Sequence, residues 1–420
     1  MPNDVRRIGH AYRAYLPIAL IFFSMVPALV IVPVLKDLIK DRLHGTNDAV
    51  AYFISVAQLA AFLGAPLAGF LSDRLRNRRT LVALFALINA VCFFAFTLLD
   101  SIEALLFLRF VEGGVSIFVI GLLMASVTDF EHEPGQSHRG RLVGLAGTML
   151  ALGAAVGLVA GRLGNRDPLL PFCAASAMMA MVGICALVFL RDGPFHKTES
   201  LQLGRVLQAF QERPQLLLPF VYTFVDRFTV GFLISSFNIH LRETIGLPAG
   251  QVGLFLATVL GPMALLSLPV VLLVRRTGPI LPVFLGSLLY GSAIAAAGLL
   301  SQPLEIYLAV LFAGLGAGIM FVPSILLAAR LAPPDLRGTV MSAFMGAGAL
   351  GFMLGPLTSV ALEHNLRYLV RPDLLFGTLA LIFGMLEVLM ILFSVPFVGS
   401  LRRALGGPSI GTESLPGKFE

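Results

Sequence analysis

The stretch from residue 69 to residue 81 reads GFLSDRLRNRRTL. A single acid, Asp73, is followed by four arginines between two long apolar runs. A short basic segment of this kind is typical of a cytoplasmic loop in a membrane protein. Asp73 stands where the preceding helix should end, and the helix dipole disfavours a negative charge there. We therefore expect Asp73 to contact a cation or the N-terminus of another helix.

The composition agrees with a membrane protein. Of 420 residues, 57% are hydrophobic and 13% are charged, whereas globular proteins carry roughly 25% charged residues. This excludes a soluble enzyme, a disordered protein and a domain with one membrane anchor. The net charge of +6 fits the accumulation of Lys and Arg in cytoplasmic loops, so it gives no reason to expect a nucleic-acid partner.

Charged residues mark the ends of the apolar runs. Nine uncharged stretches contain 20 to 31 residues each, which is enough to cross a bilayer. Three more apolar stretches contain internal charges and begin near Ala104, Pro214 and Leu374. All twelve should be α-helices, because lipid cannot satisfy free backbone groups.

The loops predict the orientation. If the N-terminus is cytoplasmic, 20 basic residues fall on the cytoplasmic side and 8 on the other. The positive-inside rule then places both termini in the cytoplasm. The compact loops favour a bacterial inner membrane, that is, a plasma membrane crossed many times.

The chain divides near its midpoint. We expect a six-helix bundle at 1–190, a cytoplasmic linker at 191–213, a second six-helix bundle at 214–400 and a cytoplasmic tail at 401–420. Shifting residues 139–157 by 198 positions onto 337–355 gives 6 identities in 19 positions, which indicates a duplication. Two repeats with a central cavity form a transporter architecture. Within the linker, the apolar spacing over 201–210 predicts a short surface helix on the membrane.

The 69–81 segment resembles the loop between helices 2 and 3 of the major facilitator superfamily. The matching positions are Gly69, Leu71, Asp73, Arg74, Arg78 and Leu81. Arg76 replaces the family's second glycine, and we expect Asn77 to supply a left-handed turn instead. The resemblance implies an all-α membrane fold of twelve helices in two pseudo-symmetric bundles, with this loop locking a cytoplasmic gate.

Two further motifs resemble those of the superfamily. Arg109, Glu112 and Gly113 look like the fourth-helix signature of its drug–proton antiporters. Asp129 and the pair Arg139-Gly140 are similar to the residues that bracket the next loop, so the resemblance implies that Asp129 and Arg139 join the gate with Asp73.

Glycines recur in the fifth and eleventh spans. Gly153, Gly157 and Gly161 are spaced by four residues and predict tight helix packing. Gly351, Gly355 and Pro356 occupy the corresponding part of the second half. The antiporters' Gly-Pro dipeptide is present at Gly355-Pro356, whereas Leu158 follows Gly157. The first span also lacks the acid that many drug exporters carry there.

Ionisable residues within spans are expensive and should face a cavity or a partner. Arg109 and Glu112 share a helix face, so they either pair structurally or form a proton or substrate site. Asp226 and Arg227 are adjacent and point in different directions; we expect Asp226 to face the cavity. Glu387 stands alone on the last span, where a structural or lipid-adjacent role is expected.

The sequence offers no pattern for catalysis, cofactor binding or metal binding. It has no nucleotide-binding GxxxxGK[ST] loop, and Cys92, Cys173 and Cys185 lie in apolar runs, where we expect them to be buried. The function expected is therefore transport without a cofactor: a monomer that moves a small amphipathic solute by alternating access, coupled to protons, with efflux favoured. The alternatives are transport of a small anionic metabolite or siderophore, and a membrane receptor or scaffold that keeps the fold without transporting.

Overall fold

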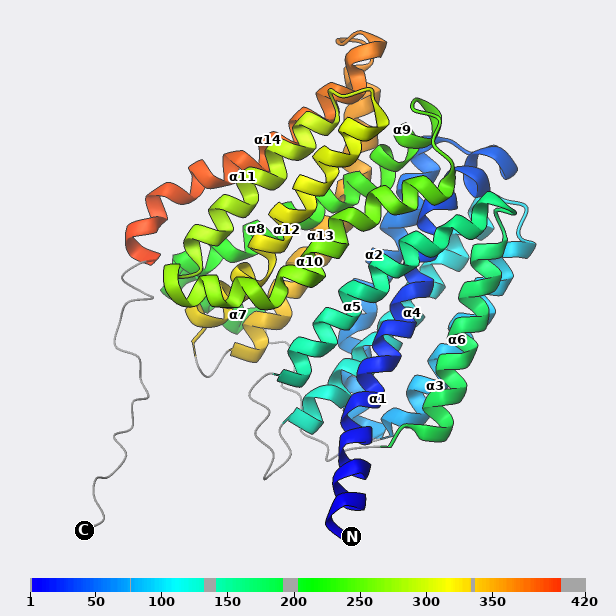
Figure 1. The fold of residues 1–420 in the computed structure, drawn as a ribbon, viewed down its shortest axis with the longest axis vertical. Helices are drawn as coiled ribbons and strands as arrows, with labels where there is room; N and C mark the ends of the chain where they lie inside the picture. Colours follow the sequence, from blue (N-terminus) through cyan, green and yellow to red (C-terminus); the bar gives the residue numbers. More distant parts are fainter. Residues whose placement is uncertain (1, 76, 132–140, 192–202, 334–336, 402–420) are drawn as a thin grey trace.

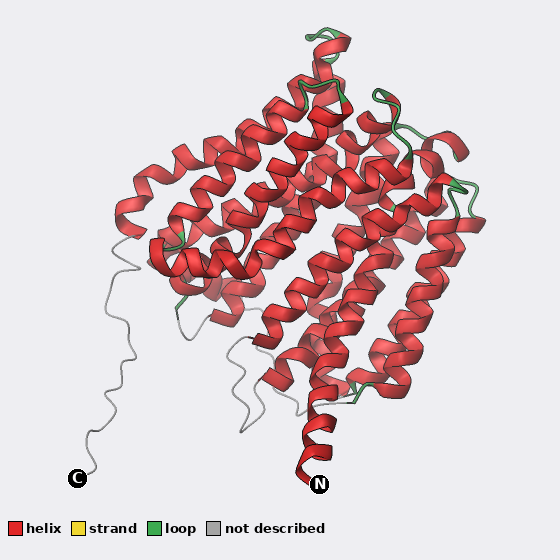
Figure 2. Ribbon diagram, in the orientation of Figure 1, coloured by secondary structure: helices red, strands yellow, loops and turns green. Residues whose placement is uncertain are grey.

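The structure is a computed structural model that describes residues 2–75, 77–131, 141–191, 203–333 and 337–401. Every regular element in these residues is helical (Figure 2). Twelve helical segments of the described chain are long and apolar enough to cross a membrane. The number and positions of the spans expected from the sequence are confirmed, including the three that carry charges.

The first six spans are continuous helices with short irregular ends. Their bounds are α1 Pro2–Val30, α2 Asn47–Leu75, α3 Arg78–Ala95, α4 Ile102–Glu131, α5 Arg141–Ala160 and α6 Leu170–Phe189. Four short 3₁₀ or π segments lie in three of the connections: η1 Val32–Val34, η2 Lys36–Arg42, η3 Phe96–Leu98 and η4 Gly161–Asn165.

The last six spans follow a short helix, α7 Leu203–Glu212. The seventh span is assembled from η5 Pro214–Leu216, α8 Leu217–Phe232, η6 Leu233–Phe237 and α9 Asn238–Glu243. The remaining five are α10 Ala249–Thr277, α11 Ile280–Ala297, α12 Pro303–Leu331, α13 Arg337–Leu366 and α14 Pro372–Ser394, which continues into η8 Val395–Phe397.

The two halves repeat the same helix pairings (Figure 1). In the first half α1 packs on α5, α2 on α4, and α3 on α6. In the second half the corresponding spans pair identically, α8 with α13, α10 with α12, and α11 with α14. The repeated sequence motif is thus accompanied by a repeated packing scheme.

Glycines set the closest of these contacts. A Cβ atom at Gly153 would lie 2.5 Å from the Phe22 carbonyl oxygen, and one at Gly157 would lie 2.5 Å from that of Val26. These glycines therefore let α5 approach α1 at backbone distance. In the second half, a Cβ at Gly351 would overlap the Phe224 carbonyl, so α13 approaches α8 in the same way.

The short helix in the linker forms at Leu203–Glu212, close to the expected place. Phe210 packs edge-on against Phe220 of α8, with ring centroids 4.8 Å apart. It therefore adds to the apolar core of the second half. Its contact with a membrane surface stays a prediction.

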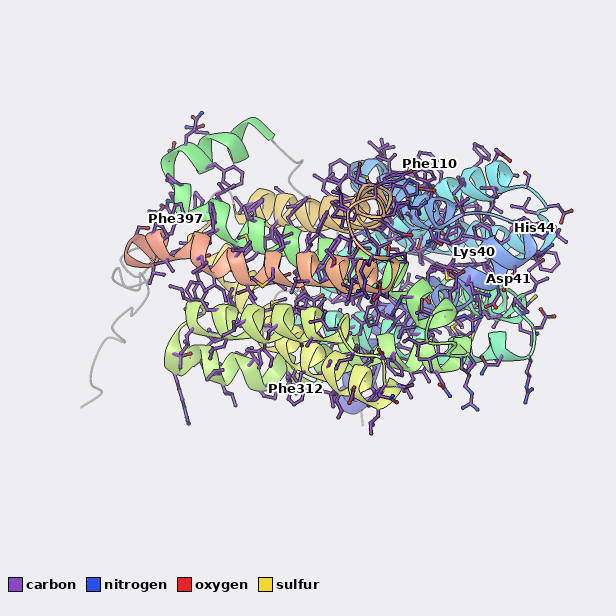
Figure 3. The ribbon with its side chains drawn as sticks, turned by 90° about the horizontal axis from the view of Figure 1, so that it is seen from above. Lys40, Asp41, His44, Phe110, Phe312 and Phe397 are labelled. Carbon is purple, nitrogen blue, oxygen red and sulfur yellow. The ribbon has the colours of Figure 1, made fainter. Side chains whose placement is uncertain are left out.

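The outer surface carries large apolar side chains. Phe107 is 71% exposed and Leu265 is 75% exposed, and Phe110 and Phe312 lie on opposite outer edges of the molecule in Figure 3. Apolar exposure on this scale marks a surface that meets lipid. It also corrects one expectation: Cys92 is buried, but Cys173 is exposed and Cys185 half-buried, because the sixth span turns much of its surface outward.

Candidate functional site: charges within and between the halves

The first intramembrane pair is buried between three helices. Glu112 Oε2 accepts a hydrogen bond from Arg109 Nη1 at 2.5 Å, and the Glu112 side chain is 2% exposed. Asn89 of α3 donates to the other carboxylate oxygen at 3.5 Å. The Arg109 guanidinium lies 4.6 Å from the ring centroid of Phe53 in α2. The ion pair therefore joins α2, α3 and α4, which accounts for the tolerance of both charges in a span.

The second pair sits in α8. Arg227 Nε lies 3.6 Å from Asp226 Oδ2, so the adjacent residues meet despite their different directions. The Arg227 guanidinium also lies 5.1 Å from the centroid of Phe321 in α12. Its side chain is 25% exposed, against 16% for Asp226. Asp226 interacts electrostatically with Tyr290 of α11 and with Glu387 of α14.

Glu387 corrects an expectation. A structural or lipid-adjacent role is expected on the last span; the side chain is fully buried, which contradicts the lipid-adjacent position and leaves the structural role. The physical reason is a close approach of α11 and α14, in which a Cβ at Gly291 would lie 2.8 Å from Glu387 Cβ. Both carboxylate oxygens lack a hydrogen-bond partner among the described residues.

The loop at 69–81 joins the ends of α2 and α3. Asn77 does not adopt the expected left-handed turn: its φ is −140°, and its side-chain oxygen accepts a hydrogen bond from the Thr80 backbone N–H at 3.0 Å. Asparagine is a favoured N-cap residue, so it starts α3 directly. The buried Arg78 and its neighbour Arg79 begin this helix, and Arg79 Nε donates to the Leu187 carbonyl of α6 at 2.6 Å.

The other residues expected at this gate cannot be placed in the same detail. The backbone positions of Gly69, Asp73 and Arg74 fall in α2 and that of Asp129 in α4. Their side chains, and the whole of Arg139, lie outside the described part of the structure.

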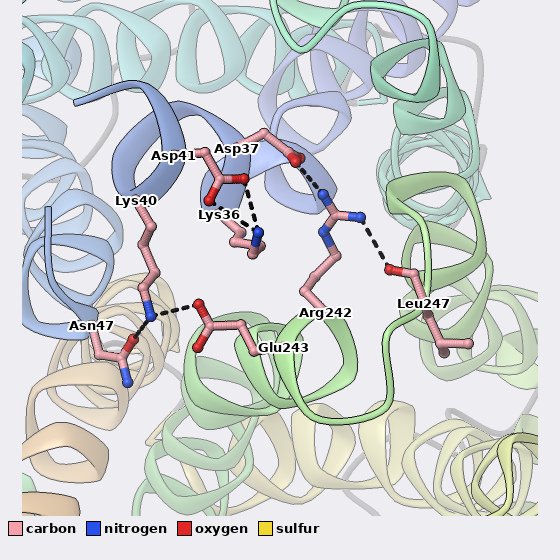
Figure 4. Close-up of polar contacts among 8 residues, drawn as sticks. All are labelled: Lys36, Asp37, Lys40, Asp41, Asn47, Arg242, Glu243 and Leu247. Atoms are coloured by element: carbon pink, nitrogen blue, oxygen red, sulfur yellow. Dashed lines mark hydrogen bonds and ion pairs between the residues drawn. The ribbon is translucent and has the colours of Figure 1, made fainter. Parts of the chain in front are cut away.

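A set of polar contacts joins the two halves at the end of the molecule where α1 stops, which we call the far end (Figure 1). Its centre is shown in Figure 4. Arg242 of α9 donates to Asp37 of η2 and, at 3.0 Å, to the Leu247 carbonyl. Beside it, Lys40 Nζ lies 2.5 Å from Glu243 Oε1 and donates to Asn47 at 2.8 Å. These ion pairs link the first and seventh spans.

Further contacts extend this far-end network on both sides. The contacts between the halves are Asn47 with Glu363 at 3.3 Å, His364 with Asp48 at 3.5 Å, Ser55 with the Met353 carbonyl at 2.7 Å, Asn238 with the Val32 carbonyl at 2.8 Å, and Asn165 with the Gly250 N–H at 2.9 Å. A Cβ at Gly253 of α10 would overlap the Leu158 carbonyl of α5. The halves therefore meet at backbone distance here and are held by charges.

Elsewhere the described part of the chain offers little that resembles a site. An apolar hollow between α5 and α10 is lined by Ala155, Val156, Val159, Ala160, Arg162 and Ala257. It contains none of the intramembrane ion pairs. Within the described residues, no cluster of His, Cys, Asp and Glu could hold a metal ion.

Comparison with known proteins assigns the fold and the family. A model of the major facilitator superfamily matches residues 18–356 and, in a second overlapping match, 219–406. The chain belongs to the major facilitator superfamily. It is a membrane transporter of small solutes and not an enzyme.

Solved structures of the major facilitator superfamily share its fold at low sequence identity. The nucleoside transporter NupG superposes with a TM-score of 0.74 at 14% identity, over 91% of this chain and 98% of that one. A bacterial homologue of the human lysosomal transporter Spinster, inward-facing and unoccupied, gives 0.72 at 17% identity, over 94% and 98%. The human organic anion transporter MFSD10 gives 0.64 at 19% identity, over 91% and 99%. No curated protein sequence matches this chain.

For a member of this superfamily, the far-end network is the part of the site that sequence reasoning missed. The sequence did contain a signal. Charged residues follow the first span and the seventh, which correspond in the two repeats. The π segments η2 and η6 also fall at corresponding places, and such irregular turns are frequent at functional sites.

Proposed function

We propose that this protein is a proton-coupled secondary transporter that moves a small amphipathic organic solute by alternating access, with export favoured. The observation that carries this proposal is the far-end network. The two halves are joined there by ion pairs that a rigid-body rocking motion could break and remake. A transporter needs a seal that can also open, because its two access states must be close in free energy.

The intramembrane charges are the proposed coupling and substrate residues. Glu112 is the first candidate for the transported proton, with Arg109 as its partner in the unprotonated state. Asp226 and Arg227 are the second candidates. Each would exchange partners between the two access states, which is what links a proton to a conformational change.

The opposite gate is proposed at the 69–81 loop. Asp73, Arg74 and Arg78, with Gly69 allowing close approach, would close the end at which α1 begins, together with Asp129 and Arg139. On this proposal both termini are cytoplasmic, the membrane is a bacterial inner membrane, and the transporter works as a monomer.

A small anionic metabolite is the second candidate substrate. The observation that favours it is the greater exposure of Arg227, whose guanidinium also lies over the Phe321 ring. A guanidinium presented in this way binds carboxylates or phosphates in a planar, two-pronged geometry.

The test is a flux assay in proteoliposomes, using a panel of amphipathic cations, neutral solutes and organic anions, with and without a proton gradient. A reversible cross-link across the far end serves as the control. Cysteines replacing Asp48 and His364, in a background without the three native cysteines, should cross-link the far end when oxidised.

Gradient-dependent accumulation that stops on cross-linking and returns on reduction is the expected result. The class of solute that accumulates, amphipathic or anionic, distinguishes the two candidate substrates. Flux that continues after cross-linking would contradict the proposed mechanism. No flux of any solute would favour a non-transporting role.

A further inference from the structure

The second half contains a buried carboxyl group that the proposed transport cycle does not yet use. Glu387 is fully buried, and neither of its oxygens has a hydrogen-bond partner among the described residues. The hydroxyl of Tyr290, on the neighbouring α11, is likewise buried and unpartnered. An ionised carboxylate without partners in an apolar interior is so costly that the group binds a proton instead.

The surroundings of Glu387 exclude both lipid and bulk water. On the far-end side, Phe383 stacks on Phe228 and Phe232 at centroid distances of 5.0 and 4.5 Å. On the other side, Ser394 donates to the Tyr222 hydroxyl at 2.9 Å. Glycines on α11 and α14 close the remaining face, because a Cβ at Gly291 or Gly384 would overlap the opposite backbone.

The charges around Glu387 do not balance if every acid is ionised. Tyr222 and Asp226 from α8 and Tyr290 from α11 interact electrostatically with Glu387. Arg227 interacts with Asp226 and Tyr290 of this group. Glu387 therefore faces the carboxyl group of Asp226 and has no cation of its own among the described residues. Arg227 already pairs with Asp226 at 3.6 Å. Like charges that share a site cannot both ionise easily, so the proton belongs on Glu387.

We propose that Asp226, Tyr290 and Glu387 form a proton-binding site in the second half, with Arg227 setting its occupancy. When Arg227 pairs with Asp226, the site holds one proton, on Glu387. When Arg227 is drawn away, Asp226 loses its counter-ion and takes up a second proton through its partly exposed side chain. Tyr290 interacts electrostatically with both acids, and its hydroxyl has no hydrogen-bond partner among the described residues.

This inference deepens the proposed function, because it supplies a second proton carrier, but its test needs no transported solute. Infrared spectra of the purified full-length protein, recorded while the pH is stepped, report protonated carboxyl groups directly. The wild type should show one solvent-shielded protonated carboxyl at pH values where exposed acids are ionised. Glu387→Gln should abolish that absorption, and Glu305→Gln, at an exposed position on α12, should leave it unchanged.

Two more variants test how Asp226 and Arg227 act on this site. Asp226→Asn removes the negative charge that faces Glu387, so Glu387 ionises more readily and the shielded absorption should weaken. Arg227→Ala leaves two acids without a cation, so a second shielded carboxyl should appear.

An unchanged absorption in Glu387→Gln would overturn the proposal. So would a failure of Glu387→Gln to fold while Glu305→Gln folds, because glutamine matches the protonated acid in size and charge. Either result would leave the proposed transport function untouched. A failure to find a transported solute would likewise not affect the infrared result.

Discussion

Glu112 illustrates what one buried residue demands of its surroundings. Its carboxylate is met by Arg109 and by the amide of Asn89, from two helices. A charge in this position is stabilised by its partners and strongly destabilised without them. We therefore expect different effects from neutralising the acid, Glu112, and from removing the base, Arg109.

Glu112→Gln should fold and bind solute but lose gradient-driven accumulation, because the amide cannot carry a proton through the cycle. Passive exchange should remain measurable in the same proteoliposomes, and Glu305→Gln is the exposed control. Normal accumulation by Glu112→Gln would assign the pair a structural role and make Asp226 the next candidate for coupling.

Arg109→Ala should be worse than Glu112→Gln, because it leaves a carboxylate buried without its cation. Breaking a buried pair in this way costs about 3–5 kcal/mol. The loss should appear as a lower midpoint of thermal unfolding in detergent. The double variant with Glu112→Gln should recover much of that loss; if it does not, the packing of the Arg109 side chain on Phe53 matters more than the charge.

At the scale of helices, the contact between α5 and α10 is the tightest link between the halves at the far end. Gly253 has no room for a side chain against the Leu158 carbonyl. Gly261, two turns further along α10, has open space where its Cβ would be. The same substitution at these two positions therefore separates a packing effect from a general effect on the helix.

Gly253→Val should push α10 away from α5 and disfavour the state in which the far end is closed. Overpacking of this kind costs about 1–3 kcal/mol, enough to change the populations of two nearly balanced states. Spin labels at His44 and Tyr368, both exposed at the far end, should report a longer distance. Gly261→Val should leave it unchanged. Equal distances in both variants would show that this contact does not hold the end closed.

For the whole molecule, the first prediction concerns orientation. The 20-to-8 distribution of basic residues predicts that cysteines at Asn77 or Ser409 react with an impermeant reagent from the cytoplasm alone, and a cysteine at Asn365 from the outside alone. Native cysteines are removed first, because Cys173 is exposed. Reaction at Asn77 from outside would reverse the topology.

The second whole-molecule prediction concerns the proposed gate at the opposite end. Asp73→Asn should insert normally but slow transport, because it weakens the contacts that close that end and so favours the state with the far end closed. Cysteines placed at Asp48 and His364 should become less accessible, because the far end is then closed more of the time. Unchanged flux together with unchanged accessibility would remove Asp73 from the gate.

The twelve spans follow from the sequence alone. Each segment must be long and apolar enough to cross lipid, and it meets this requirement without help from the rest of the fold. The repeat also follows from local sequence, since Gly153 and Gly351 fall in equivalent helix pairs. Local helix capping sets the conformation of Asn77. The sequence predicts a left-handed turn there, and this prediction is wrong because asparagine also serves as an N-cap residue.

The tertiary structure alone decided which charges meet. Asp37 and Arg242 are 205 positions apart, and their pairing depends on how one half sits on the other. The burial of Glu387 likewise depends on glycines in a different helix, α11. Hydropathy describes how each residue type partitions between water and an apolar phase. Whether a charged side chain finds a partner depends on how the helices are assembled.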